Sequence, residues 1–148
     1  MSDRALGTNP KDIIGSTKVS ITKLPVITTV MGAMAMMDGA GKYGPYNWRE
    51  NKVIASVYVD ALMRHAMAWF EGQESAGDSH VHHLGHVVAC AGILLDAQAT
   101  GNLVDDRPTV ACVPGQEGNW FTILLDKLSG VIKTKLNGKK QLTATWSE

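Results

Sequence analysis

The chain of 148 residues lacks the sequence features that mark secreted and membrane proteins. It has two cysteines, Cys90 and Cys112, and neither lies in a CxxC motif, so a disulfide framework is excluded and reduced thiols are expected. No apolar run approaches a membrane span, and the polar start MSDRALGTNPKD does not resemble a signal peptide. We therefore expect a cytoplasmic protein with no membrane partner.

The chain also has no excess of charge of either sign. Fourteen basic residues balance fourteen acidic ones, which argues against a large nucleic-acid surface but allows one nucleotide to be held by a few local Arg and Lys. No GxxxxGK[ST] motif is present, so a P-loop is excluded. A His-Asp dipeptide is also missing, and with it the ligand pattern of HD phosphohydrolases.

The apolar residues predict a mainly all-α fold. Residues 25–41 read as a buried helix that begins at Pro25. Apolar residues with 4-3-4-3 spacing predict a second helix over residues 48–70, with Asn47 as N-cap and Gly72 after its end. A third helix is expected over residues 80–99, capped by Asp78 or Ser79. The short connection makes the second and third helices an antiparallel hairpin, the centre of a bundle.

The two ends of the chain give weaker patterns. Residues 1–24 look irregular. Near the other end, NWFTILLDKLSG predicts a short helix between Asn119 and Gly130, and Asn137-Gly138 predicts the turn of a β-hairpin. We therefore expect a helical nucleotide-binding domain over residues 1–106 and a C-terminal appendage, a short helix plus a hairpin, over residues 107–148.

All five histidines lie within residues 64–86, RHAMAWFEGQESAGDSHVHHLGH. In a helical hairpin, His65 would face His83 and His86, which lie three residues apart on one helical face. Three imidazoles plus carboxylates could coordinate Mn, Fe, Ni or Zn. The cofactor expected for the chain is a divalent metal, which is Mn, Mg, Co or Zn. The alternative is that each histidine is a satisfied residue in the core or at its rim.

The carboxylates near these histidines are the candidate catalytic groups. Glu71 lies two turns after Arg64 on nearly the same helical face, so it could point into the site and act as base. Asp78 is the second candidate, either as base or as metal ligand. Arg64 itself could hold phosphate.

The stretch KYGPYNWR combines cationic and aromatic side chains. Lys42 and Arg49 could contact phosphate, and Asn47 could pair with the edge of a base. The aromatic residues could stack on a base; they are Tyr43, Tyr46 and Trp48. The alternative is a loop whose aromatic residues fix it to the neighbouring helices.

Several of these motifs, in this order, resemble a phage-encoded family, that of the N-terminal domain of dATP/dGTP diphosphohydrolases. The resemblance rests on NPKD, GAGKYGPYNWR, RHAMAWFEG and HHLGH followed by a helix ending in ILLDA, and it covers residues 9–101. It implies hydrolysis of purine deoxynucleoside triphosphates to monophosphate and pyrophosphate. The tail from residue 102 lies outside it.

A more distant resemblance links the chain to the all-α MazG-type pyrophosphohydrolases. Those proteins carry ExxE on one helix and ExxD on the next, and the four carboxylates hold divalent metal. Here His83-Leu84-Gly85-His86 stands where ExxD is expected, and the ExxE spacing of Glu71 and Glu74 includes Gly72. A site rich in histidine would prefer a softer metal than Mg.

Two functions from different classes follow, and a purely structural helical protein is a third possibility. The first is a metal-dependent hydrolase of purine nucleoside triphosphates, in which a metal-bound water attacks the α-phosphorus. The second is a phage protein without catalysis that sequesters a host signalling nucleotide in the host cytoplasm. In either case the apolar first helix favours a homo-oligomer, a dimer or tetramer.

Overall fold

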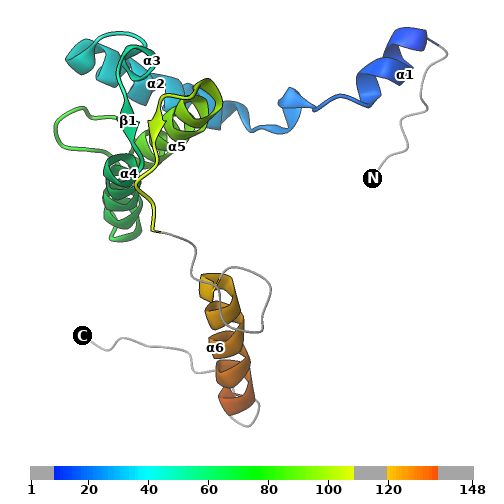
Figure 1. The fold of residues 1–148 in the computed structure, drawn as a ribbon, viewed down its shortest axis with the longest axis vertical. Coiled ribbons are helices and arrows are strands. Elements are labelled where there is room, and N and C mark those ends of the chain that lie inside the picture. The colour runs from blue at the N-terminus through cyan, green and yellow to red at the C-terminus, as the bar shows by residue number, and fades with distance from the viewer. Residues whose placement is uncertain (1–8, 109–119, 137–148) are drawn as a thin grey trace. The chain divides into compact units, whose positions relative to one another are not determined.

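The computed structural model describes residues 9–108 and 120–136 of the chain. The chain divides into two units, residues 1–107 and residues 108–148, which are considered separately. The first unit is mainly helical, as predicted (Figure 1). Its elements in chain order are α1 (Pro10–Ser16), the 3-10 turn η1 (Ile21–Lys23), α2 (Val26–Tyr43), α3 (Asn47–Glu50), β1 (Val53–Ile54), α4 (Ala55–Phe70), α5 (His83–Thr100) and β2 (Leu103–Val104).

Helix α5 is the central element, because both α2 and α4 pack against it. The contact with α2 is close and depends on glycine. A Cβ on Gly85 would lie 2.6 Å from the carbonyl oxygen of Met31, and a Cβ on Gly32 would lie 2.7 Å from Cγ1 of Val88. The two backbones can therefore approach at this crossing only because neither glycine carries a side chain.

A short parallel ladder fixes how α4 and α5 lie side by side. Strand β1 leads directly into α4 and pairs with β2, which follows α5, with Val53 opposite Leu103. The start of α4 is thus held beside the end of α5, and the two helices run in opposite directions. Asp106, just after β2, accepts hydrogen bonds from the backbone N–H and the hydroxyl of Ser56, so it caps the first turn of α4.

The helix expected over residues 48–70 is interrupted, and this part of the prediction is wrong. α3 ends at Glu50, Asn51 is extended, and the chain forms β1 before α4 begins at Ala55. The backbone N–H of Val53 donates to the carbonyl of Asn102, and the Val53 side chain is 1% exposed. This pairing and burial outweigh the helical pattern. Asn47 is the first residue of α3 and not a cap.

The third helix also begins later than expected, at His83 instead of residue 80. His80 has a left-handed φ of 58°, which a continuing helix does not allow. The N-cap is His82, whose Nδ1 accepts from the Leu84 N–H at 3.1 Å while its Nε2 pairs with Glu74 at 3.0 Å. The expectation that Asp78 or Ser79 caps this helix is therefore wrong.

The first residues described are not irregular, contrary to expectation. Residues 10–16 form α1, with Pro10 in the first turn and the Asn9 side chain accepting from the Lys11 N–H at 3.0 Å. A cap followed by proline is a recognised helix start, and it was missed because no apolar period follows it.

In the second unit, α6 (Trp120–Leu136) runs through Gly130, where an end was expected. Residues 131–136, expected to form the first arm of a hairpin, are its last turns. Helical phase explains this, since Leu124, Leu128 and Val131 continue one apolar stripe across the glycine. Asn119, Asn137 and Gly138, the expected cap and turn, lie outside the described residues.

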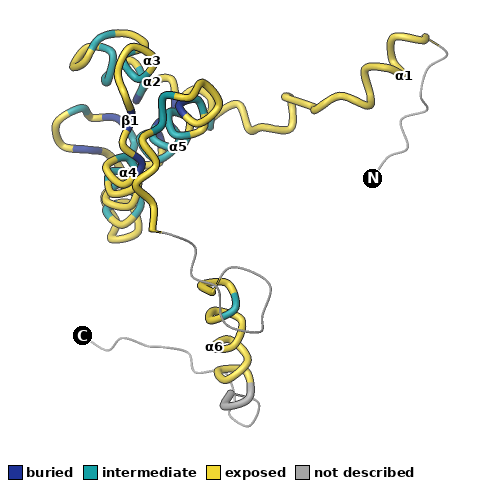
Figure 2. Tube along the Cα trace, viewed as in Figure 1, coloured by how far each residue is buried: buried dark blue, intermediate teal, exposed yellow. Residues whose placement is uncertain are grey.

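The buried core of the described residues is small (Figure 2). Seven apolar residues are buried, and all are alanine or valine: Ala35, Val53, Ala55, Ala76, Val81, Ala89 and Ala97. Within the described ranges, no helix is long and apolar enough to cross a membrane.

Candidate functional site

A cleft of about 460 Å³ lies between α2, α4, α5 and the loop before α5. Because α4 and α5 run in opposite directions, His65 near the end of α4 lies beside His86 near the start of α5. Tyr58 and Ile93 line the cleft two turns away, about 10 Å along the helices. The cleft therefore has a polar end at the histidines and an apolar end at Tyr58 and Ile93.

Lys42 is the cationic group of the polar end. Its Nζ lies 2.8 Å from Oδ2 of Asp38, one turn earlier on α2, and 2.8 Å from Oδ2 of Asp78 in the loop. These hydrogen bonds raise the pKa of Lys42, and the Lys42 ammonium lowers the pKa of Asp78. One ammonium is thus held by two carboxylates at the mouth of the cleft.

The three predicted metal ligands lie together, as the hairpin geometry predicted. Nδ1 of His65 lies 2.8 Å from Nδ1 of His83, and the His65 ring stacks on His86 with ring centres 4.3 Å apart and an interplanar angle of 9°. Nε2 of His86 pairs with the Ser79 hydroxyl at 3.0 Å. His83 is 6% exposed, and its Nε2 has no hydrogen-bond partner among the described residues.

Two of these imidazoles are held in the neutral form. Burial lowers the pKa of His65, and the neighbouring His86 and His83 lower it further. Burial also lowers the pKa of His86, although Asp38 and Asp78 oppose the shift. Near neutral pH the polar end therefore presents one cation, two carboxylates and uncharged imidazoles.

This arrangement does not fit a resident metal. The nitrogen lone pairs of an imidazole lie in the plane of its ring, and the stacked rings of His65 and His86 lie in two nearly parallel planes, so their lone pairs do not converge on one ion. Nδ1 of His65 and Nδ1 of His83 are paired with each other. Among the residues described, no three His, Cys, Asp or Glu side chains are placed to hold a metal ion.

The apolar end carries aromatic groups from three helices. Tyr43 on α2, Trp48 on α3 and Tyr58 on α4 line the cleft, as does Asn47, and the Trp48 indole donates to Asp96, about one turn beyond Ile93. Burial raises the pKa of the Tyr58 hydroxyl and of the Cys90 thiol, so both are protonated near neutral pH. Flat aromatic faces beside one amide can both stack on a base and read its edge.

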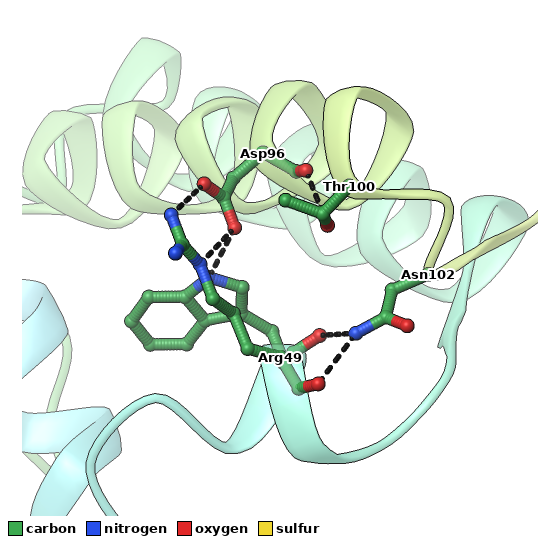
Figure 3. A network of polar contacts seen from close by, with 5 residues as sticks. Arg49, Asp96, Thr100 and Asn102 are labelled. Atoms are coloured by element: carbon green, nitrogen blue, oxygen red, sulfur yellow. Dashed lines mark hydrogen bonds and ion pairs between the residues drawn. The ribbon is translucent and has the colours of Figure 1, made fainter.

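Arg49, predicted to bind phosphate, is directed to α5 instead (Figure 3). Its guanidinium makes two hydrogen bonds to Asp96, at 2.9 and 2.6 Å, and the Trp48 indole N–H donates to the same carboxylate at 2.9 Å. The Asn102 amide donates to the carbonyls of Trp48 and Arg49. These contacts fix α3 to the end of α5 and set the position of the Trp48 ring.

The predicted site residues fall into two groups. The cleft is lined by seven of them: Lys42, Tyr43, Asn47, Trp48, His65, Asp78 and His86. Five are not among its lining residues: Tyr46, Arg49, Arg64, Glu71 and His83. Of these, His83 does not line the cleft itself but pairs through its Nδ1 with Nδ1 of His65, which does. Arg64 is close enough for its charge to lower the pKa of His65. Glu71 is exposed at the C-cap of α4.

Sequence reasoning missed Asp38 and Tyr58 as lining residues. Asp38 could have been found from its i,i+4 spacing to Lys42, which places the two side chains on one helical face. Tyr58 is one of the residues whose 4-3-4-3 spacing predicted the second helix, together with Ile54, Ala61, His65 and Ala68, and this spacing indicates no other role for it. Its role at the cleft depends on where α3 and α5 lie, and local spacing does not carry that information.

The chain is thus a mainly helical protein whose cleft combines aromatic and charged side chains. Residues 8–107 match the family model described as dATP/dGTP diphosphohydrolase, N-terminal. The chain belongs to this family, which confirms the resemblance noted from its motifs. No curated protein and no solved structure matches the chain.

Proposed function

We propose that the chain hydrolyses purine deoxynucleoside triphosphates to the monophosphate and pyrophosphate. The observation that carries this proposal is the two-ended cleft, with aromatic rings and an amide at one end and Lys42 at the other. A nucleotide would place its base between the rings and its phosphates beside Lys42. The family description supports the reaction and the purine base.

The polar end supplies the groups that the reaction needs. Water attacks the α-phosphorus, the bond to the bridging oxygen breaks, and pyrophosphate leaves. Lys42 would exchange a carboxylate for a phosphate oxygen, which leaves Asp38 or Asp78 free to orient the water. The neutral imidazoles of His65 and His86 are the groups that could accept its proton.

Product analysis of the purified full chain tests this proposal. Each of the deoxynucleoside triphosphates is incubated with Mg, Mn, Co or Zn, and the products are separated by chromatography. We expect equal amounts of monophosphate and pyrophosphate from the purine substrates. Asp38→Asn together with Asp78→Asn should lower the rate about 10²-fold, because neither carboxylate then remains to orient the water. Asp60→Asn, which changes an exposed carboxylate on α4 that does not line the cleft, should leave the rate unchanged.

A second candidate is a nucleotide-sequestering protein, and one observation favours it. The carboxylates beside Lys42 are engaged by that ammonium, and His65 Nδ1 and His86 Nε2 are engaged by neighbouring side chains. Such a cleft can bind phosphate without activating water. Absence of turnover with every nucleotide and metal, together with tight binding and recovery of intact ligand after denaturation, would replace the first proposal by this one.

A further inference from the structure

The side of α2 turned away from α5 carries an apolar seam. It consists of Ile27, Val30, Met34 and Met37, spaced 3-4-3, and these side chains are between 45% and 74% exposed. Gly32 and Ala35, on the opposite side of the helix, are buried. No charged residue occurs between Lys23 and Asp38, so the seam has none of the charges that usually cover an exposed helix face.

The small core of this unit means that few of its large apolar side chains, including those of the seam, are buried within one chain. The buried apolar residues are all alanine or valine, and the largest fully buried side chain is Val53. Large apolar side chains contribute most to folding stability when they are buried. A unit that leaves its isoleucines and methionines exposed needs another surface to cover them.

We propose that the α2 seam is the interface between two copies of this chain. The spacing reads the same in both directions, so an antiparallel second α2 places Ile27 opposite the partner's Met37 and Val30 opposite the partner's Met34. Each residue then contacts its counterpart reciprocally across a two-fold axis, as closed dimers require.

The lack of charge on the seam favours a second copy as its occupant. Residues 24–37 contain no charged side chain, so an antiparallel partner α2 covers the seam with an equally uncharged face of the same length. The opposed helix dipoles favour the antiparallel direction.

The test compares two matched pairs of substitutions in the full chain by light scattering after size exclusion. The wild type should have at least twice the chain mass of 15.9 kDa. Val30→Lys with Met34→Lys should give the monomer mass with an unchanged helical circular dichroism spectrum. Val59→Lys with Met63→Lys is the control, because these α4 side chains have the same types and spacing and are 38% and 56% exposed. The control should keep the wild-type mass.

Cysteine cross-linking tests the pairing without adding charge. In a Cys90→Ser, Cys112→Ser background, a Val30→Cys chain mixed with a Met34→Cys chain should form a disulfide-linked dimer on mild oxidation. The equivalent mixture of Val59→Cys and Met63→Cys chains should not.

Three results would overturn the proposal. A wild-type monomer would show that the seam is covered within one chain, for example by α6, or stays exposed. Loss of the dimer in the α4 control but not in the α2 variant would show that the interface is on α4 and not on the seam. Cross-linking of the α4 cysteines without cross-linking of the α2 cysteines would show the same.

Discussion

At the scale of single residues, Lys42 determines the chemistry of the polar end. It is the only cationic side chain among the lining residues of the cleft described here, and its two carboxylate partners come from different parts of the chain. The negative charge of a triphosphate entering the cleft would therefore be paired with the Lys42 ammonium. Arg49 cannot do so while it remains paired with Asp96.

We expect Lys42→Met to weaken nucleotide binding at least about tenfold, because a charge-assisted hydrogen bond is lost and two carboxylates are left facing the phosphates. Calorimetric titration measures the change. Lys52→Met is the control, since the Lys52 ammonium donates to the Gly101 carbonyl and does not line the cleft. Equal affinities in the two variants would show that phosphate binds elsewhere.

The histidines predict how stability depends on pH. The pKa values of His65 and His86 are lowered in the folded chain, so the unfolded chain binds more protons as the pH falls. Their contribution to folding stability is fully present above pH 6.5, the ordinary pKa of histidine. It decreases as the pH falls from 6.5 towards the lowered pKa values of the folded chain.

Urea unfolding at pH 7.5, 6.5 and 5.5 should therefore show decreasing stability. In a His65→Asn, His86→Asn double variant the decrease should be smaller. His80→Asn is the matched control, because His80 is exposed and asparagine tolerates its left-handed backbone. A double variant with the full wild-type pH dependence would contradict this account.

At the scale of elements, the crossing of α2 and α5 depends on two glycines with different neighbours. A Cβ on Gly85 would meet the backbone carbonyl of Met31, which cannot move without shifting α2, whereas a Cβ on Gly32 would meet the end of the Val88 side chain. We expect Gly85→Ala to destabilise the fold by roughly 1–3 kcal/mol, and Gly32→Ala by less.

Gly92→Ala provides the control on the same helix. Nothing lies within 4 Å of its added Cβ, so the higher helix propensity of alanine should stabilise the chain by up to about 1 kcal/mol. Thermal and urea unfolding of the three variants measures their stabilities and so tests the expected order, with Gly92→Ala the most stable and Gly85→Ala the least. If Gly85→Ala were as stable as Gly92→Ala, the close approach of α2 and α5 would be wrong.

The elements also show how far the sequence predicts the structure. Helical spacing predicted α2, most of α4 and α5, and the meeting of His65 with His83 and His86, because these depend on local period and one short connection. The interruption at β1 was not predictable in this way, since Val53 pairs with residues 50 positions later. The same holds for Arg49, whose partner Asp96 is distant in sequence.

At the scale of the whole molecule, the α2 seam and the small core predict that stability depends on protein concentration. If folding is coupled to pairing, unfolding releases two chains from each dimer, and a tenfold rise in concentration favours the folded dimer by about 1.4 kcal/mol. For two chains of this length, that corresponds to a rise in Tm of about 2–4 °C.

Scanning calorimetry over a hundredfold range of concentration tests this prediction. The Tm of the wild type should rise with concentration, and so should that of the Val59→Lys, Met63→Lys control. The Val30→Lys, Met34→Lys variant should unfold at a lower Tm that does not change with concentration, because its seam cannot pair. A wild-type Tm that stays constant over this range would mean that unfolding does not separate two chains, and the proposed pairing through α2 would be wrong.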